Sequence, residues 1–383
     1  MEPWENSAWI AYQGNLPPLT FIQGEWCEQE HSRIIEIKNR IEFVESQEEW
    51  ELRKKITNPY EAIFSGGGGD ATFPSIANVQ PLSRSYFKMI EMLSVCEFWK
   101  NIVTKSTPFV SAHICEGPGG FLQYTVEEAK GRKLSIGNIY AMTLRPSKAH
   151  IPGWRRSIHF LKKHPQIQLE YGADDTGNIL VPTNQQAFCK RAMGAQLFTA
   201  DGGFDFSIDY ANQEQMSYPL LLASFTMGLG SLAKGGTMII KLFDMYSNAT
   251  KDLLLGTAKL FKEFTVYKPA TSRPCNSERY FMARGYVGQV NPQAILWIRH
   301  LQEAQIKHAQ QPIQRLIKTP WPSNILAALQ EQIDFQESQQ IQTLTESLEL
   351  DKNSIPGKML KGIETSKQWC EVFKIPTHPL SFP

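Results

Sequence analysis

The sequence predicts an α/β protein with a doubly wound, Rossmann-like sheet of seven mostly parallel strands and helices on both faces. In the middle of the chain, short apolar runs alternate with stretches of helical periodicity, which indicates βαβ units. The last two apolar runs are joined by a loop with proline and serine and no helix, so we expect the final strand to be antiparallel. The strands are expected at residues 109–115, 139–144, 167–171, 196–200, 237–242, 264–267 and 280–286.

Helical patterns divide the chain into three parts. We expect an N-terminal helical and loop segment at 1–80, a central α/β domain at 81–290 and a helical C-terminal extension at 291–383. The extension is rich in glutamine, and Pro320 and Pro322 separate its helices. The four glycines of Ser65-Gly-Gly-Gly-Gly-Asp70 indicate a loop. The helices are expected at residues 82–105, 215–233, 249–262, 294–309 and 324–349, and a charged amphipathic stretch covers 33–55.

Composition limits the classes of function. The 383 residues are 42% hydrophobic, enough for one large α/β domain with appendages. The net charge of +1 gives no support to indiscriminate nucleic-acid binding, although it leaves room for a local basic channel. The six cysteines are scattered without metal-binding spacing, so we expect reduced thiols in a cytosolic compartment and no bound metal. No apolar run is long enough for a membrane span.

A glycine-rich loop follows the first strand of the central domain. The segment Ile114-Cys-Glu-Gly-Pro-Gly-Gly-Phe121 precedes a helical stretch, and its glycines allow a ligand to approach the backbone closely. The spacing is neither that of the dinucleotide fingerprint nor that of the Walker phosphate loop, which argues against a dinucleotide or a triphosphate. Taken alone, the segment is also compatible with a simple turn.

Three charged residues lie where further strands begin or end. Asp201 follows the fourth strand in Ala200-Asp-Gly-Gly, and Glu278 precedes the last strand. Lys241 stands at the end of the apolar run Ile240-Lys-Leu-Phe-Asp244. A lysine in an apolar strand is costly unless it is paired or its ammonium group extends into solvent.

Together these motifs resemble the FtsJ-like ribose methyltransferases. The glycine loop, Ala-Asp-Gly-Gly, Lys-Leu-Phe-Asp and Ser272-Arg-Pro-Cys-Asn-Ser-Glu-Arg-Tyr280 occur in the order of that family, over about 60% of the chain. With Asn58-Pro-Tyr-Glu61 upstream, the similarity is greatest to the cap-specific messenger RNA 2′-O-methyltransferases. The resemblance implies the methyltransferase variant of the Rossmann-like fold, S-adenosylmethionine as cofactor and the capped 5′ end of mRNA as substrate.

The resemblance also implies a Lys-Asp-Lys-Glu catalytic set. The last three members map to Asp201, Lys241 and Glu278, and the first maps to Lys88, with Lys100 and Lys105 as alternatives. A lysine base has an ordinary pKa of about 10.4; burial and a nearby cation lower it, whereas carboxylates raise it. We therefore expect Lys241 to accept or orient the hydroxyl proton. Lys88 is expected to lower the pKa of Lys241 and hold the oxygen, and the two acids to position the ammonium groups.

The same resemblance assigns the cofactor site. The methionine part is expected at the glycine loop and next to Asp201, and the adenosine near Tyr171-Gly-Ala-Asp-Asp-Thr-Gly-Asn-Ile179. Three residues of the second segment remain open as adenosine ligands, and a plain solvated turn is the alternative. The expected cofactor residues are Cys115, Glu116, Gly117, Pro118, Gly119, Gly120, Phe121, Asp201 and one of Asp174, Asp175 and Asn178.

Several polar and basic residues are candidates for RNA contact. A basic stretch from Arg145 onward has no acid and contains Trp154, so it offers charges for phosphates and an aromatic face for a cap guanine. Such a stretch is equally compatible with a solvated face. The residues expected to contact RNA are Lys54, Arg145, Arg155, Arg156, Asn212, Gln213 and Asn276.

Two other functions compete with cap methylation. One is 2′-O-methylation of ribosomal or transfer RNA on the same fold, and the other is a non-catalytic RNA-binding subunit that keeps the fold. The compact chain with its helical tail is similar to enzymes of large DNA viruses, which implies a cytoplasmic location, a viral factory or a virion, with the nucleus as an alternative. The C-terminal helices are expected to dock other capping or transcription proteins.

Overall fold

The structure is a computed structural model of the chain. It describes residues 8–12, 14–26, 32–65, 75–102, 107–146, 153–203 and 212–378. The glycines at 66–69 and the alternative catalytic residue Lys105 therefore lie outside the described residues.

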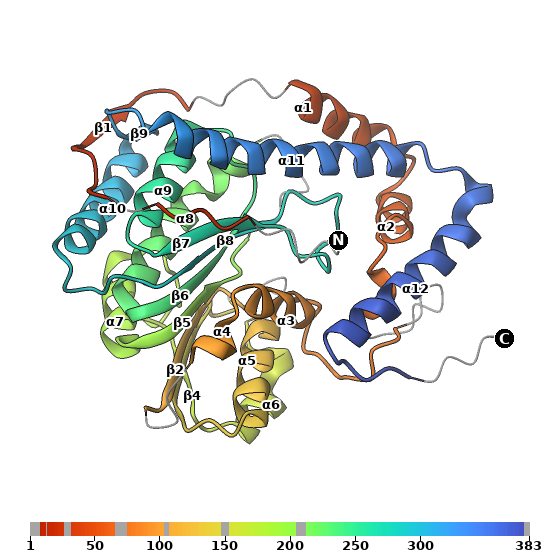
Figure 1. Cartoon of the computed structure of the whole chain (residues 1–383), viewed down its shortest axis with the longest axis horizontal. Coiled ribbons are helices and arrows are strands. Elements are labelled where there is room, and N and C mark those ends of the chain that lie inside the picture. The colour runs from red at the N-terminus through yellow and green to blue at the C-terminus, as the bar shows by residue number, and fades with distance from the viewer. Residues whose placement is uncertain are drawn as a thin grey trace.

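A seven-stranded mixed sheet forms the centre of the molecule (Figure 1). Its strand order is β4-β3-β2-β5-β6-β8-β7, and only β8 runs antiparallel to its neighbours. The seven expected strands and the antiparallel last strand are confirmed. The strands are β2 (Phe109–Ile114), β3 (Ile136–Met142), β4 (Ile167–Glu170), β5 (Ala195–Ala200), β6 (Leu232–Leu242), β7 (Glu263–Tyr267) and β8 (Arg279–Arg284).

Alternating apolar residues give the sheet two buried faces. Leu197 and Phe198 are adjacent in β5, yet Leu197 packs in one core cluster and Phe198 in another. Tyr280 and Phe281 of β8 divide in the same way. This follows from the two-residue period of a strand, and it requires a layer of helices on each side.

The helices form these two layers. The cluster of Leu197 contains residues of α3, α4 and α5, and the cluster of Phe198 contains residues of α7, α8, α9 and α10. The helices of these layers are α3 (Ser85–Val95), α4 (Phe98–Asn101), α5 (Gly120–Gly131), α6 (Ile158–Lys163), α7 (Pro182–Ala192), α8 (Gln213–Ser231), α9 (Asn248–Ala258) and α10 (Pro292–Gln310).

The helix expected at 82–105 is interrupted. It ends at Val95, and Glu97 adopts a left-handed conformation with φ 49° before the short helix α4 begins at Phe98. The turn lets Phe98 pack against Phe109, with ring centroids 6.1 Å apart. The apolar periodicity was thus correct up to this turn.

The N-terminal and C-terminal segments pack on each other outside the sheet. Strand β1 pairs antiparallel with β9, a strand that the sequence pattern did not reveal between the two expected C-terminal helices. In Figure 1, α11 crosses one edge of the molecule and contacts α1, and α12 folds back beside α2. These elements are β1 (Leu19–Gln23), α1 (Ser32–Asn39), α2 (Gln47–Ile56), β9 (Ile313–Ile317), α11 (Ser323–Leu348) and α12 (Ile355–Val372).

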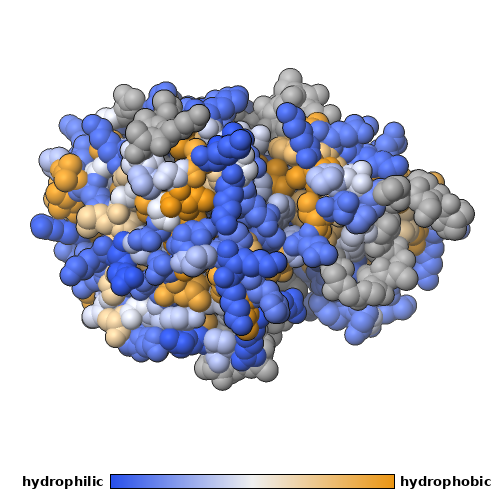
Figure 2. All heavy atoms as spheres, turned by 90° about the horizontal axis from the view of Figure 1, so that it is seen from below, coloured by the Kyte–Doolittle hydropathy of each residue, from blue (hydrophilic) through white to orange (hydrophobic). Residues whose placement is uncertain are grey.

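The surface has the mixed character of an ordinary folded domain. Figure 2 shows one face on which hydrophilic residues predominate and apolar residues form small separate patches. None of the described helices is long and apolar enough to cross a membrane.

Candidate functional site

Four charged side chains from distant parts of the chain meet at one edge of the sheet. Lys88 lies in α3, Asp201 follows β5, Lys241 lies near the end of β6 and Glu278 precedes β8. The register explains part of this, because Lys241 pairs with Tyr280, two residues beyond Glu278. We call these four side chains the lysine–carboxylate cluster.

Ion pairs connect the whole cluster. Lys88 Nζ lies 2.6 Å from Glu278 Oε1, and Lys241 Nζ lies 3.9 Å from Glu278 Oε2. Lys241 Nζ is also 3.2 Å from Asp201 Oδ1 and donates to the Asp201 carbonyl oxygen at 2.9 Å. Each side chain is only 12–14% exposed. Lys241, the lysine in the apolar strand, is therefore paired, and this pairing offsets the free-energy cost of burying its charge.

The electrostatics of the cluster differ in one respect from the sequence-based expectation. Burial disfavours the charged form of Lys241, but Asp201 and Glu278 outweigh it and raise the pKa of Lys241 above 10.5. The expected lowering of this pKa by Lys88 is wrong for the protein alone, because the two carboxylates have the larger effect. Burial also opposes ionisation of Glu278, yet Lys88, Lys241 and Lys268 hold its pKa well below the usual range.

Tyr280, Ser272 and Lys268 support the cluster, and sequence reasoning did not select them. Tyr280 donates its hydroxyl to Asp201 Oδ1 at 2.8 Å, and Ser272 donates to Glu278 Oε1 at 2.7 Å. Lys268 donates to the Glu278 carbonyl oxygen at 2.8 Å. Burial lowers the pKa of Lys268 to about 7. The available signal was their position: Ser272 and Tyr280 lie inside the last motif, and Lys268 directly follows β7.

A second group of buried charges lies beside the first. Glu61, 1% exposed, accepts two hydrogen bonds from Arg273 at 3.0 and 3.1 Å and pairs with Arg84 at 3.3 Å. Arg84 is the residue before α3, which carries Lys88, and Arg273 lies in the loop that leads to Glu278. We call Glu61, Arg84 and Arg273 the arginine clamp. It joins the Asn58–Glu61 segment to α3, which carries Lys88, and to the loop that leads to Glu278.

The glycine loop fits tightly between α3 and the loop around Gly153. A Cβ atom at Gly120 would lie 2.2 Å from Ser85 Oγ, and one at Gly117 would lie 2.6 Å from the Gly153 carbonyl oxygen. Gly119 has φ +106°, a conformation that favours glycine. These glycines bring the N-terminal end of α5 close to the helix that carries Lys88.

A buried polar network lies at the base of this loop. His113 Nδ1 is 2.7 Å from Thr199 Oγ1 and 3.2 Å from Glu116 Oε2, and Thr199 donates to Glu116 Oε1. Burial raises the pKa of Glu116 despite its neighbours. Glu116 Oε2 accepts no hydrogen bond from any part of the chain that the structure describes. Phe121 is fully buried, and burial raises the pKa of the Cys115 thiol to about 12.

The three candidate adenosine residues all take part in local contacts. Asp174 accepts hydrogen bonds from Thr176 and from Asn184 Nδ2, the latter at 2.8 Å. Asn178 Oδ1 accepts from the Leu180 N–H at 3.0 Å. Asp175 pairs with Arg145 at 2.6 Å. The geometry does not choose among Asp174, Asp175 and Asn178, so their assignment stays a prediction.

Two of the basic RNA candidates are occupied by internal contacts. The Lys54 side chain, 11% exposed, pairs with Glu51, and its ammonium lies 5.8 Å from the centre of the Trp50 ring. The Arg145 guanidinium pairs with Asp175 and stacks at 3.7 Å on the Tyr171 ring. These contacts compete with phosphate binding.

The other RNA candidates differ in exposure. Arg155, Arg156 and Asn276 are exposed, and Asn212 is exposed next to residues outside the described range. Gln213, in contrast, is only 7% exposed and has little surface to offer a ligand. Trp154 is 6% exposed and packs against Leu122 and Ile139, so its expected role as a free stacking face is wrong.

Within the described ranges, no three or more His, Cys, Asp or Glu side chains lie together in a way that suits a metal ion.

Comparison with known proteins gives consistent relatives. Residues 81–286 match the FtsJ-like methyltransferase family. A Trypanosoma cruzi protein described as cap-specific mRNA (nucleoside-2′-O-)-methyltransferase 1 is 30% identical over 266 residues, which cover 66% of this chain and 71% of that protein. A Danio rerio protein described as cap-specific mRNA (nucleoside-2′-O-)-methyltransferase 2 is 26% identical over 331 residues, covering 84% of this chain and 44% of that protein. This chain therefore matches less than half the length of the Danio rerio relative.

The solved structures are more distant. A Plasmodium falciparum ribosomal RNA methyltransferase matches 54% of this chain and 98% of its own, with 18% sequence identity and a TM-score of 0.37.

Proposed function

Because the chain belongs to the FtsJ-like methyltransferase family, we propose that it transfers a methyl group from S-adenosylmethionine to a ribose 2′-hydroxyl beside the mRNA cap. The observation that carries this proposal is the lysine–carboxylate cluster, with Lys88, Asp201, Lys241 and Glu278 joined by ion pairs. The names of the relatives support the cap as the substrate.

The glycine loop suits the methionine part of the cofactor. It offers three glycines without side chains between β2 and the N-terminal end of α5, where backbone N–H groups bind anionic groups such as a carboxylate. Glu116 lies at the base of this loop, 3.2 Å from His113, where its carboxyl group would support the loop near the cofactor's ammonium group. We assign Cys115–Gly120 and Asp201 to this part of the site, and one of Asp174, Asp175 and Asn178 to the adenosine. Phe121, also expected here, is fully buried against Tyr280 and supports the loop from behind. When bound, the cofactor supplies an electrophilic methyl group next to a positive sulfonium.

The cluster then has two tasks. A ribose hydroxyl is a weak nucleophile at neutral pH, so the protein must orient its oxygen and handle its proton. We assign Lys88 to hold the oxygen and Lys241 to accept or orient the proton. To accept it, Lys241 must first lose its own proton, which Asp201 and Glu278 oppose. The same carboxylates hold the ammonium groups of Lys88 and Lys241 in place through ion pairs.

Substrate contacts follow from the exposed candidates. Arg155, Arg156 and Asn276 lie on the surface and are available to phosphates. Lys54 is nearly buried beside Glu51, whereas Arg145 is half exposed and keeps N–H donors for a phosphate while it pairs with Asp175. Contacts of Asn212 and Gln213 with RNA, and docking of capping or transcription proteins on the C-terminal helices, remain parts of the proposal.

A single incubation tests the proposed function. The full chain is mixed with S-adenosylmethionine and a short capped RNA, and the product is analysed by mass spectrometry after nuclease digestion. We expect a 14 Da gain on a ribose next to the cap, and none on the same RNA without a cap. Equal methylation of capped and uncapped RNA would favour a ribosomal or transfer RNA substrate, and no transfer would favour a binding subunit.

A further inference from the structure

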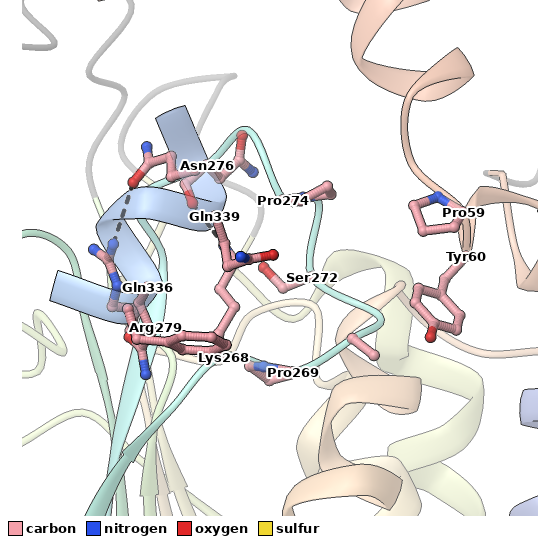
Figure 3. Close-up of a pocket in the computed structure, with 13 residues that line it drawn as sticks. Pro59, Tyr60, Lys268, Pro269, Ser272, Pro274, Asn276, Arg279, Gln336 and Gln339 are labelled. Carbon is pink, nitrogen blue, oxygen red and sulfur yellow. Dashed lines mark hydrogen bonds between the residues drawn. The ribbon is translucent and has the colours of Figure 1, made fainter. Parts of the chain in front are cut away.

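A cavity of about 270 Å³ opens beside the lysine–carboxylate cluster. Figure 3 shows its three walls: Pro59 and Tyr60 on one side, glutamine side chains of α11 on the other, and between them the loop that rises from Lys268 to Asn276. The cavity is thus formed by segments from the N-terminal part, the sheet and the C-terminal extension.

Two residues connect the cavity to the cluster. Ser272 and Lys268 both line the cavity. Ser272 donates to the Glu278 carboxylate at 2.7 Å, and Lys268 donates to the Glu278 carbonyl oxygen at 2.8 Å. A molecule in the cavity is therefore separated from the cluster by a single layer of side chains.

Aromatic rings stand on two sides of the cavity. Tyr60 is 7% exposed, whereas Phe335, on α11, is 60% exposed. An exposed aromatic ring at the rim of a cavity suits stacking on a flat ligand, because stacking shields the facing side of each ring from water.

A polar side chain on the rim of the cavity can read the edge of a flat ligand. Gln339 lines the cavity and is exposed, so its amide offers both a donor and an acceptor. Gln336, on the same helix, lines the cavity beside it and donates through Nε2 to the Val266 carbonyl oxygen at 2.7 Å.

The lining carries little net charge. Arg279 is buried and pairs with Asp244 at 3.5 Å, and burial lowers the pKa of Lys268 to about 7. The cavity-lining residues of the described chain include no carboxylate. An uncharged nucleobase, with a flat ring and with donors and acceptors on its edge, suits such a lining.

We infer that this cavity binds a nucleobase of the substrate and that α11 supplies part of its specificity through Phe335, Gln336 and Gln339. The inference rests on the proposed function and deepens it. Helix α11 lies outside the part of the chain that matches the family, residues 81–286, so this contribution would belong to the C-terminal extension. The base belongs either to the cap or to the transcript.

Two variants on exposed positions test the inference with little risk to folding. Phe335→Ala and Gln339→Ala alter the cavity rim, and Gln342→Ala is the matched control, exposed on the same helix but not part of the lining. Calorimetric titration of the full chain uses three probes: a GpppG cap dinucleotide, an uncapped 5′-triphosphate RNA tetranucleotide and inorganic triphosphate. For Phe335→Ala we expect affinity for a base-containing probe to fall about fivefold or more, since stacking on one ring contributes about 1–3 kcal/mol.

The three probes separate the outcomes. A loss confined to the cap dinucleotide assigns the cavity to the cap base, and a loss with the tetranucleotide assigns it to a transcript base. Unchanged affinity for both, or an equal loss with inorganic triphosphate or in Gln342→Ala, overturns the inference.

Methyl transfer by the unaltered chain to capped RNA is measured in parallel, so that the two proposals fail separately. If methyl transfer occurs but the variants bind normally, only the cavity assignment is lost. If the variants lose nucleotide affinity but no methyl is transferred, only the enzyme assignment is lost.

Discussion

Two buried groups of charges lie side by side, and they use different cations. The lysine–carboxylate cluster pairs two lysines with Asp201 and Glu278, whereas the arginine clamp pairs two arginines with Glu61. Both are largely shielded from water, and the loop from Ser272 to Glu278 belongs to both. The difference between them lies in what each cation can do.

Arginine and lysine suit different tasks. A guanidinium has five donors in a fixed plane and remains charged. Arg273 uses two of these donors to bind the two oxygens of Glu61. An ammonium is a compact charge whose pKa responds to its surroundings. The clamp is therefore suited to fixing the backbone on which Lys88 and Glu278 stand, and the cluster to moving a proton.

The largest difference is expected when Lys241 is removed. Lys241→Ala should lower kcat for methyl transfer by about 10²–10⁴-fold, because proton handling by a positioned group contributes that much. Cofactor affinity should change little. Lys100→Ala is the control, since Lys100 was an alternative member of the catalytic set but is 76% exposed and pairs with Glu97, away from the cluster. Undiminished turnover in Lys241→Ala would remove Lys241 from the mechanism.

Removal of the clamp carboxylate should act mainly on stability. Glu61→Ala removes the carboxylate that Arg84 and Arg273 share. Arg84 keeps three backbone carbonyl acceptors and Arg273 keeps Glu51, so the free energy of unfolding should fall by about 1–3 kcal/mol. Urea denaturation followed by circular dichroism measures this. Glu61→Gln keeps the shape and should recover part of the loss. If Glu61→Ala were as stable as the unaltered chain, the clamp would not hold these segments together.

The pH dependence of the rate distinguishes the two roles left open for Lys241. Its pKa is raised above 10.5 in the protein alone, so only a small fraction is neutral near pH 7. If Lys241 accepts the proton, kcat/KM at limiting cofactor should rise up to about tenfold per pH unit between pH 6.5 and 9. A flat profile over this range would leave Lys241 only the orienting role.

The smallest expected effect is the loss of stability at acidic pH that follows from protonation of Glu278. The pKa of Glu278 in the folded protein lies below its usual value of 4.5, so its ion pairs contribute stability above that pH. This contribution is lost as pH falls from about 4.5 toward the folded-state pKa. The unaltered chain should exceed Glu278→Gln in unfolding free energy by on the order of 2 kcal/mol at pH 7, and by less at pH 3. A difference that is constant with pH would contradict the assignment.

The sequence was sufficient for the sheet and for the residues that meet at its edge. Apolar runs marked the seven strands, and strand ends that share one edge bring their flanking residues together. Lys241, Asp201 and Glu278 drew notice because they are charged residues at the ends of apolar strands. The resemblance to the FtsJ-like family then grouped them into one site and added Lys88, with Lys100 and Lys105 as alternatives.

The sequence was insufficient where partners are far apart and not confined to strand ends. Nothing in Asn58–Glu61 alone reveals that Glu61 binds Arg84 and Arg273. The direction of the Lys241 pKa depends on distances between four side chains, which spacing along the chain does not contain. Trp154 was misread because a tryptophan beside basic residues has the same local pattern whether its ring faces solvent or the core.

The β1–β9 pairing has a consequence for biosynthesis. Leu19 emerges from the ribosome early, but its partner Ile317 is made much later. At about 5–20 residues per second, roughly 15–60 s separate the two, so β1 must wait with open hydrogen-bonding groups while the intervening domain is translated. A nascent chain stalled before residue 313 would still expose this strand to chaperones and proteases.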